Sequence, residues 1–447
     1  MAKTEKTKYL IIGNSAGGIG AAEAIRKADK TGAISIVSDE SYPAYCRPLI
    51  SEHLAEGCPL ERMLFRPADF YEKNNIQTFL GKKVARLDID GHTIKLENGR
   101  EITWEKLLLS TGGVPIFPRM KGAERQGVFT FTTLDDAKAI GRFLDKKSRA
   151  VVIGGGLIGI SVTEALVKRG VKVTVIEMRE RVLNIMLDEE ASALEETTLK
   201  QAGVKIITNH TVAEIKGTSS TGGTVSGVTL DDGSSIPCNL LIVAIGVQPR
   251  IELASGTAIK VNRGLVVNRQ MATSCPDVYA CGDAAEAYDF NYGENRLTPI
   301  WPNAYLGGRI AGFNMAGTPT QYPGGTALNS LKYFGLASVS AGIVNPPKDG
   351  YEILSRKDNN TYRKIILKDG LVAGLVFVGD IEKSGIVFNL MKDKVNVNGF
   401  KQALIAADFG LSSLPEKIWR QKLEKPLTSL TPQATAAPVE EEAIAGE

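Results

Sequence analysis

The stretch RAVVIGGGLIGISVTEALVKRGVKVTVIEM, residues 149–178, decides the fold. Its apolar run at 150–153 predicts a buried strand, and the apolar spacing over 157–169 predicts a helix. A second strand is predicted at 171–177, and the glycines at 154–156 form the turn between the first strand and the helix. This order of strand, turn, helix and strand is a βαβ unit.

Three glycines in this unit follow the pattern G-x-G-x-x-G. Gly154 permits the tight turn, Gly156 lets a pyrophosphate approach the backbone, and Gly159 lets the helix pack close to the strand. The start of the helix then presents free amides to the phosphates. Glu177 ends the next strand, where a carboxylate accepts hydrogen bonds from ribose hydroxyls and repels a 2′-phosphate. The unit therefore predicts a dinucleotide site that favours NAD over NADP, a preference that Arg179 weakens.

A second copy of the pattern lies at KYLIIGNSAGGIGAAEAIRK, residues 8–27. A strand at 9–12 leads through a turn of small residues into a helix, and AISIVSD at 33–39 predicts the next strand. Here Ser15 replaces the middle glycine of the pattern, and Ser38 stands where the ribose acid is expected. Two copies imply two dinucleotide-binding domains in one chain.

Two apolar segments connect the copies. LLLSTGGVPIFP at 107–118 predicts the crossing from the first domain to the second, and NLLIVAIGVQPR at 239–250 predicts the return. PDVYACGDAAEA at 276–287 predicts a strand ahead of a helix. From about residue 325 the pattern changes to strands, with a hairpin turn at KDG, and then to helical spacing in GIVFNLMKDK and GFKQALIAADF. These features predict a third domain of the α+β class.

Composition excludes several classes of protein. The chain has 447 residues, 43% hydrophobic and 23% charged, and a formal net charge of +3 without a basic block, so we expect no nucleic-acid partner. The longest apolar runs, such as LLIVAIGV at 240–247, are far shorter than the roughly 20 residues that cross a bilayer, so no membrane span is expected. The N-terminal sequence lacks a signal-peptide profile, which favours a cytoplasmic protein. Five cysteines without a C-x-x-C pair, and three scattered histidines, predict neither a disulfide framework nor a metal site.

Together these motifs resemble the pyridine nucleotide-disulfide oxidoreductase class of FAD flavoproteins, over about residues 8–420. GNSAGG resembles the FAD motif of the class, GGGLIG its NAD motif, STGG and AIGVQPR its crossing strands, and YACGDAAEA its second FAD motif. YCRPLIS resembles the Y-x-R-P-x-L-S loop of ferredoxin and rubredoxin reductases. The last domain, with its FVGD sequence, is similar to those of rubredoxin reductases and of the flavoprotein part of NADH-nitrite reductases.

The resemblance implies an α/β fold with two Rossmann-like dinucleotide-binding domains, one inserted in the other, and a C-terminal α+β domain. We expect the FAD-binding domain at 1–118 and 246–324, the NAD-binding domain at 119–245 and the α+β domain at 325–422. The tail, 423–447, is rich in Pro, Ala, Thr and Glu, and we expect it to be disordered.

The resemblance also implies two sets of cofactor-binding residues. Asp283 is expected to bond the ribityl chain of FAD, and the helix that begins near Asn303 is expected to point its N-terminus at the flavin. Trp301 is read as an aromatic wall of the site, with an ordinary core tryptophan as the alternative; the ribose acid on the FAD side is Asp39 or Glu40. The FAD set is Gly13, Ser15, Ala16, Gly17, Gly18, Asp39, Glu40, Arg47, Pro48, Thr111, Gly112, Gly282, Asp283, Trp301 and Asn303. The NAD set is Gly154, Gly156, Leu157, Ile158, Gly159, Glu177 and Gly246.

Cys46 raises the question of thiol chemistry. Disulfide reductases of the class carry C-x-x-x-x-C after this loop, which is missing here, and single-cysteine relatives place theirs one or two positions further along. We therefore expect Cys46 to lie beside the cofactor without reacting, and keep catalysis by its thiol as the alternative. Ferredoxin reductases also often pair a Lys with a Glu near the flavin; the matching positions here are Glu52 and Ser161, so that pair is lost.

These observations predict an FAD-dependent NAD(P)H oxidoreductase that moves electrons between NADH and a protein acceptor, either a ferredoxin, a rubredoxin or an iron–sulfur subunit of a larger complex. One alternative is an NADH oxidase, peroxidase, coenzyme A-disulfide reductase or persulfide reductase that uses Cys46. Another is a flavin-bearing assembly or sensing subunit with little turnover of its own. The identity of the acceptor, the direction of transfer and the oligomeric state, a dimer or a complex subunit among them, stay open.

Overall fold

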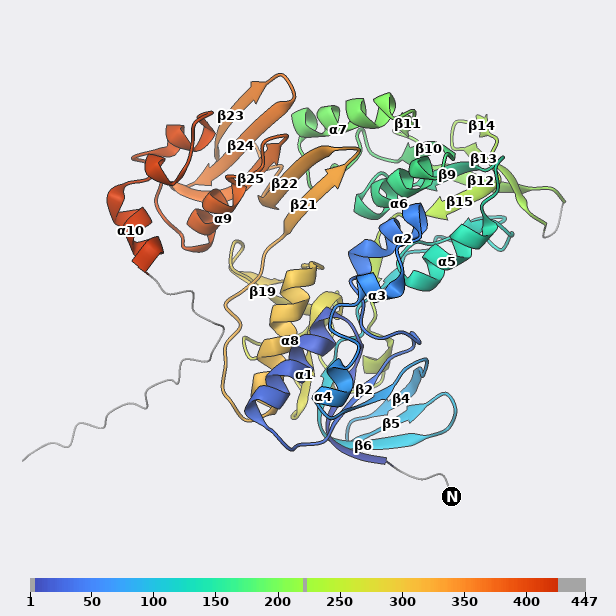
Figure 1. The fold of residues 1–447 in the computed structure, drawn as a ribbon, viewed down its shortest axis with the longest axis vertical. Coiled ribbons are helices and arrows are strands. Elements are labelled where there is room, and N and C mark those ends of the chain that lie inside the picture. The colour runs from blue at the N-terminus through green and yellow to red at the C-terminus, as the bar shows by residue number, and fades with distance from the viewer. Residues whose placement is uncertain (1–4, 220–222, 425–447) are drawn as a thin grey trace, which may run out of the picture.

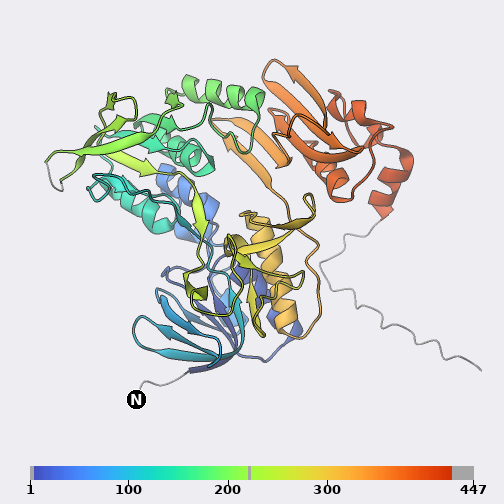
Figure 2. The ribbon, with the colours of Figure 1, turned by 180° about the vertical axis from the view of Figure 1, so that it is seen from behind.

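The computed structural model describes residues 5–219 and 223–424. Figure 1 shows one group of elements at the bottom of the molecule and two groups above it, and Figure 2 shows the same arrangement from behind. Within the described ranges, no helix is long and apolar enough to cross a membrane.

The lower group is built on a seven-stranded sheet in the order β3-β2-β1-β6-β5-β4, with β18 also paired to β6. Strands β1, β2, β3, β6 and β18 run parallel, whereas β4 and β5 form an antiparallel extension. Its strands are β1 (Glu5–Ile12), β2 (Ile34–Val37), β3 (Ile76–Phe79), β4 (Val84–Asp88), β5 (Thr93–Leu96), β6 (Glu101–Leu109) and β18 (Val278–Ala280). Because β18 comes from much later in the chain than the other six strands, this sheet is built from two segments that are distant in the sequence.

Helices α1 (Ala16–Ala28) and α8 (Trp301–Met315) pack side by side against this sheet (Figure 1). Their backbones approach so closely that a Cβ atom at Gly308 would lie 1.9 Å from the Gly17 carbonyl oxygen. Short helices α2 (Ile50–Glu56), α3 (Leu60–Met63) and α4 (Phe70–Lys73) follow the second strand. The small sheet beside α8 contains β17 (Leu265–Val266), β19 (Ala285–Asp289) and β20 (Glu294–Arg296).

The second group is a parallel sheet in the order β11-β10-β9-β15-β8. Its strands are β8 (Val128–Phe129), β9 (Arg149–Ile153), β10 (Lys172–Glu177), β11 (Lys205–Thr208) and β15 (Leu240–Val243). Its helices are α5 (Leu134–Phe143), α6 (Leu157–Lys168) and α7 (Glu189–Gln201), and an antiparallel sheet is formed by β12 (Val212–Gly217), β13 (Val225–Leu230) and β14 (Ser235–Ile236). Strands β7 (Gly113–Pro115) and β16 (Val247–Pro249) pair antiparallel where the chain crosses between the groups.

The C-terminal group is an antiparallel sheet in the order β21-β22-β25-β24-β23. Its strands are β21 (Leu328–Tyr333), β22 (Leu336–Gly342), β23 (Glu352–Asp358), β24 (Thr361–Lys368) and β25 (Leu371–Val378), and its helices are α9 (Ser384–Lys392) and α10 (Glu416–Glu424). The predicted hairpin at KDG is confirmed, with Asp369 and Gly370 both at positive φ between β24 and β25. One buried cluster joins this sheet to the second group, since it contains Tyr333, Tyr362 and Val376 together with Ile160 and Leu166.

The predicted mixed α/β fold with Rossmann-like sheets is confirmed, and three local expectations are corrected. Gly282–Ala284 is a 3₁₀ turn followed by strand β19, so no helix follows Asp283 directly. GFKQALIAADF forms only a 3₁₀ turn at Lys401–Ile405. Leu423 and Glu424 still belong to α10, whereas the remainder of the predicted disordered tail lies outside the described residues.

Candidate functional site

A single cavity of about 2380 Å³ lies between the three groups of elements. Both glycine turns open into it: the turn before α1 from the lower sheet, and the turn before α6 from the second sheet. The expected residues that line it are Gly13, Ser15, Ala16, Gly17, Asp39, Glu40, Arg47, Pro48, Thr111, Gly112, Gly154, Gly156, Leu157, Ile158, Glu177, Gly246, Gly282, Asp283 and Trp301.

Four expected residues do not line the cavity: Gly18, Gly159, Asn303 and Cys46. A Cβ atom at Gly18 would lie 2.0 Å from the Gly13 carbonyl oxygen, and one at Gly159 would lie 1.9 Å from that of Gly154. Both glycines therefore allow a helix to pack against its strand. The Asn303 side chain instead donates to the Thr326 carbonyl at 3.2 Å.

The turn before α6 has room for a phosphate. Gly156 caps the helix N-terminus, and a Cβ atom placed on it would meet no atom within 4 Å. Gly154 has a φ of +103°, which side chains disfavour, and its Cβ would lie 2.4 Å from the Ala244 carbonyl oxygen. The strand end supports this turn, because the buried Glu177 carboxylate accepts the amides of Gly155 at 2.6 Å and Arg179 at 2.8 Å. A dinucleotide pyrophosphate fits the open space and the free amides of this helix start.

The two candidate ribose acids on the other side have different partners. Both oxygens of Glu40 accept hydrogen bonds, one from the Tyr45 hydroxyl and the other from the Arg47 guanidinium. Asp39 forms an ion pair with Arg250 at 2.6 Å and is more open to solvent. Ser15, at the start of α1, makes no capping hydrogen bond with its hydroxyl.

Arg47 and Asp283 are two of the charged residues in the cavity wall. The Arg47 guanidinium donates to the Thr132 carbonyl at 2.7 Å, just before α5, so it ties the loop after β2 to the second group. Burial raises the pKa of the Asp283 carboxyl, and the nearby Arg47 charge opposes this rise. Within the described ranges Asp283 has no hydrogen-bond partner. A polyhydroxyl chain such as the ribityl group of FAD would supply the donors that this carboxylate lacks.

Trp301 begins α8 and packs edge-on against Phe65, with 5.2 Å between ring centroids. It lines the cavity and is partly buried, so it is more than an ordinary core residue.

Cys46 is set back from the cavity. Its amide donates to the Met63 carbonyl at 2.7 Å, and burial raises the pKa of its thiol, which disfavours the reactive thiolate. Cys281 lies behind the first glycine turn, where its thiol contacts the Ser110 hydroxyl at 3.5 Å and burial raises its pKa to about 12. Among the residues whose positions are described, no cysteine lines the cavity.

Several lining residues were missed by the sequence analysis. Asn14 could have been found from its place in the first turn, where its side chain bonds the Tyr42 carbonyl and the Tyr71 hydroxyl. The segment 327–335 of the C-terminal group carries no motif that points to the cavity, yet it forms part of the wall. Glu52 and Ser161, the positions that match the Lys–Glu pair of ferredoxin reductases, line it as well.

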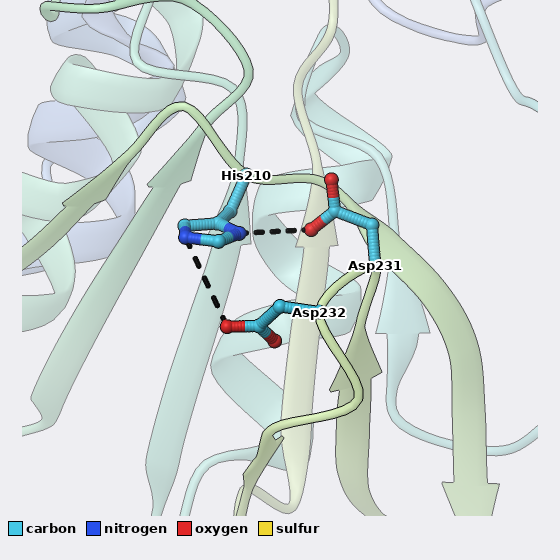
Figure 3. Close-up of side chains that lie close together, drawn as sticks. All are labelled: His210, Asp231 and Asp232. Carbon is cyan, nitrogen blue, oxygen red and sulfur yellow. Dashed lines mark hydrogen bonds and ion pairs between the residues drawn. The ribbon is translucent and has the colours of Figure 1, made fainter.

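His210, Asp231 and Asp232 gather at the end of the second sheet (Figure 3). The His210 ring contacts one oxygen of Asp231 at 2.9 Å and one of Asp232 at 3.9 Å. Both aspartates are exposed, and His210 is partly buried.

Two glycine turns of the dinucleotide-binding type thus open into one cavity. The family described as Pyridine nucleotide-disulphide oxidoreductase matches residues 7–308, and the Rubredoxin NAD+ reductase C-terminal domain matches residues 328–395. The chain belongs to the pyridine nucleotide-disulphide oxidoreductase family. It is an oxidoreductase that uses FAD and NAD(H).

Known proteins resemble the chain over most of its length. It is 30% identical to the NADH-dependent phenylglyoxylate dehydrogenase subunit epsilon of Aromatoleum evansii, over 93% of this chain and 99% of the relative. It is 29% identical to the NADH-rubredoxin oxidoreductase of Clostridium acetobutylicum, over 84% of this chain and 92% of the relative. The solved covalent putidaredoxin reductase–putidaredoxin complex matches with a TM-score of 0.83 and 26% identity, over 93% of this chain and 98% of that one. The chain spans only about half of two longer relatives from Bacillus subtilis, a nitrite reductase (48%) and an assimilatory nitrate reductase electron transfer subunit (50%).

Proposed function

We propose that this protein takes electrons from NADH and passes them, through bound FAD, to an electron-transfer protein of the ferredoxin or rubredoxin type or to an iron–sulfur subunit of a larger complex. The observation that carries this proposal is the single cavity into which both glycine turns open. Two dinucleotides bound at these turns would share one cavity, as direct electron transfer between them requires.

The relatives support the nature of the donor and the acceptor. Two of their names contain NADH, one names rubredoxin, and a solved relative is held in a complex with putidaredoxin. One relative that matches over 99% of its length is a subunit of a dehydrogenase. A partner subunit is therefore as suitable an acceptor as a free carrier protein.

FAD, when bound, supplies the exchange between two-electron and one-electron chemistry. The residues of this chain bind the two cofactors and orient them. The helix starts at Ala16 and Leu157 would offer amides to the two pyrophosphates, and Asp283 would accept hydrogen bonds from the ribityl hydroxyls. Arg47 holds the loop after β2 against the second group, and Trp301 closes the wall beside the α8 N-terminus.

Glu177 supports NADH as the donor. Its carboxylate lies at the end of β10 with both oxygens bonded to backbone amides, which fixes a negative charge where a 2′-phosphate would lie. We expect NADH to be used in preference to NADPH.

We place the reaction in the cytoplasm. The five cysteines are all free, and proteins of reducing compartments keep their thiols in this state.

The test is to purify the protein, record its flavin spectrum, and follow NADH-dependent reduction of ferricyanide, a rubredoxin and a ferredoxin. We expect a yellow protein that reduces at least one of the two carrier proteins. Protein that stays colourless after FAD is added would refute the proposal. Reduction of ferricyanide alone would favour the assembly or sensing subunit instead.

The thiol alternative is tested with Cys46→Ser. We expect this variant to keep its NADH-dependent reductase activity, because the thiol lies outside the cavity wall and its pKa is raised. Loss of activity toward hydrogen peroxide, a coenzyme A disulfide or a persulfide in Cys46→Ser, with the flavin still bound, would establish the alternative.

A further inference from the structure

The hairpin between β21 and β22 reaches from the C-terminal group to helix α6 of the second group. The Tyr333 hydroxyl donates to the Leu157 carbonyl at 3.2 Å, and the Phe334 amide donates to the Glu164 carboxylate at 3.0 Å. All four residues line the cavity, so these two hydrogen bonds are part of its wall.

The carbonyl that accepts the Tyr333 hydroxyl lies at the first turn of α6. Leu157 is the first residue of α6 and directly follows Gly156, where the turn leaves room for a phosphate. Within an α-helix this carbonyl accepts the amide four residues on, so the tyrosine hydroxyl adds a second bond from outside the helix. Tyr333 is itself 8% exposed and packed in the buried cluster that contains Ile160. The buried Tyr333 side chain therefore holds the first turn of α6 in place.

We propose that Tyr333 is a positioning residue for NADH: by holding the first turn of α6, it keeps the amides of this turn aimed at the pyrophosphate. The C-terminal group then takes part in nicotinamide-dinucleotide binding as well as in packing. This inference rests on the proposed function, which assigns the α6 turn to NADH.

A second tyrosine of the same sheet provides a matched control. Tyr362 lies on β24 and is 5% exposed, and its hydroxyl donates to the Asp188 carboxylate at the start of α7 at 2.7 Å. It joins the same two groups of elements as Tyr333 does, but it does not line the cavity. A general loosening of the contact between the groups would affect both tyrosine variants alike.

The experiment compares Tyr333→Phe and Tyr362→Phe with the wild-type full-length chain loaded with FAD. The measurements are kcat and KM for NADH with ferricyanide as acceptor, the flavin content, and the thermal unfolding midpoint. We expect Tyr333→Phe to raise the KM roughly three- to tenfold, the effect of one lost hydrogen bond on binding, with kcat and flavin content unchanged. For Tyr362→Phe we expect a lower unfolding midpoint and an unchanged KM.

An unchanged KM in Tyr333→Phe would overturn the inference, and so would an equal rise in both variants. A wild-type protein that binds FAD but reduces no acceptor with NADH would refute the proposed function instead. The two failures are thus distinguishable in one set of measurements.

Discussion

At the scale of single residues, the Asp283 carboxylate indicates most clearly a ligand that donates hydrogen bonds. Its carboxylate is partly buried, burial raises its pKa, and the positive charge of Arg47 opposes this rise. A carboxylate held in this way is stabilised when a ligand donates hydrogen bonds to it. Within the described residues, no protein group donates such a hydrogen bond to Asp283.

Asp283→Ala should therefore weaken FAD binding, by roughly ten- to hundredfold for the loss of charge-assisted hydrogen bonds. The ratio of flavin to protein after gel filtration at low concentration measures this loss. Asp277→Asn is the control, since Asp277 pairs with Lys106 away from the cavity and an asparagine accepts its positive φ. Equal flavin retention in both variants would contradict the role of Asp283.

Many of the residues that line the cavity could be predicted from the sequence, because few arrangements besides a dinucleotide-binding βαβ turn require glycines and an acid at this spacing. The spatial partners of these residues could not be predicted. Nothing in the sequence shows that Glu40 is already bound by Tyr45 and Arg47, or that Asn303 turns toward Thr326. Such partners depend on side chains brought together by tertiary packing.

At the scale of elements, the turn before α6 separates two kinds of glycine. Gly156 faces open space, whereas Gly159 faces the Gly154 carbonyl oxygen. The same spacing pattern thus combines one position with open space beside it and one position that allows close packing.

Gly156→Ala and Gly159→Ala should then behave in opposite ways. The first should leave stability within about 1 kcal/mol of wild type, because its Cβ has room, but raise the KM for NADH. The second should destabilise the protein by about 1–3 kcal/mol or prevent folding, because its Cβ would overlap the backbone. Urea unfolding and NADH kinetics on both variants check this, and a stable Gly159→Ala protein would contradict it.

Helix α7 meets strand β22 through a buried carboxyl group. Glu195 is fully buried, and one of its oxygens accepts the Ser338 hydroxyl at 2.9 Å while the other has no hydrogen-bond partner. Burial raises the pKa of Glu195 to about 7. The protonated form is therefore the one that suits this contact.

Because the folded-state pKa lies above the unfolded value, the protein binds this proton more tightly when folded. The stability contributed by this bound proton is fully present below about pH 4.5 and is lost as the pH rises to about 7. Glu195→Gln should remove this dependence and make the protein more stable at pH 8, by on the order of 2–3 kcal/mol. Urea unfolding at pH 6 and pH 8 measures it, and a variant with the pH slope of the wild type would contradict the assignment.

The elements themselves were largely predictable where the hydrophobic period was strong. The predicted helix at 157–169 is α6, Leu157–Lys168, and the predicted strand at 171–177 is β10, Lys172–Glu177. GFKQALIAADF has helical spacing yet forms only a short 3₁₀ turn. Its apolar side chains Leu404 and Phe409 are buried against the sheet and α9 in this conformation. Tertiary packing outweighed local periodicity there.

At the scale of the whole molecule, a buried ion pair fastens the C-terminal group to the second group. Lys364 on β24 donates to Asp188 at 2.9 Å and to the Val344 carbonyl at 3.2 Å, and both charged side chains are 9% exposed. Asp188 also caps α7 and accepts the Tyr362 hydroxyl. Removing one partner leaves an uncompensated charge in a dry contact.

Lys364→Met should cost about 3–5 kcal/mol of unfolding free energy. Lys357→Met is the matched control, because the Lys357–Glu190 pair joins the same two groups but is about half exposed, and its loss should cost less than about 1 kcal/mol. Denaturant unfolding of the two variants gives the comparison. Equal costs would show that the buried pair does not hold the groups together.

The pairing of β18 with β6 has a consequence for how the protein is made. Residues 278–280 complete the sheet beside Leu107–Leu109, so this end of β6 lacks one neighbouring strand until the ribosome has added about 170 further residues. At roughly 5–20 residues per second, that interval lasts on the order of ten to thirty seconds. All five strands of the second parallel sheet, which lie between residues 128 and 243, have been synthesised by then, so this sheet can form before the lower sheet is complete.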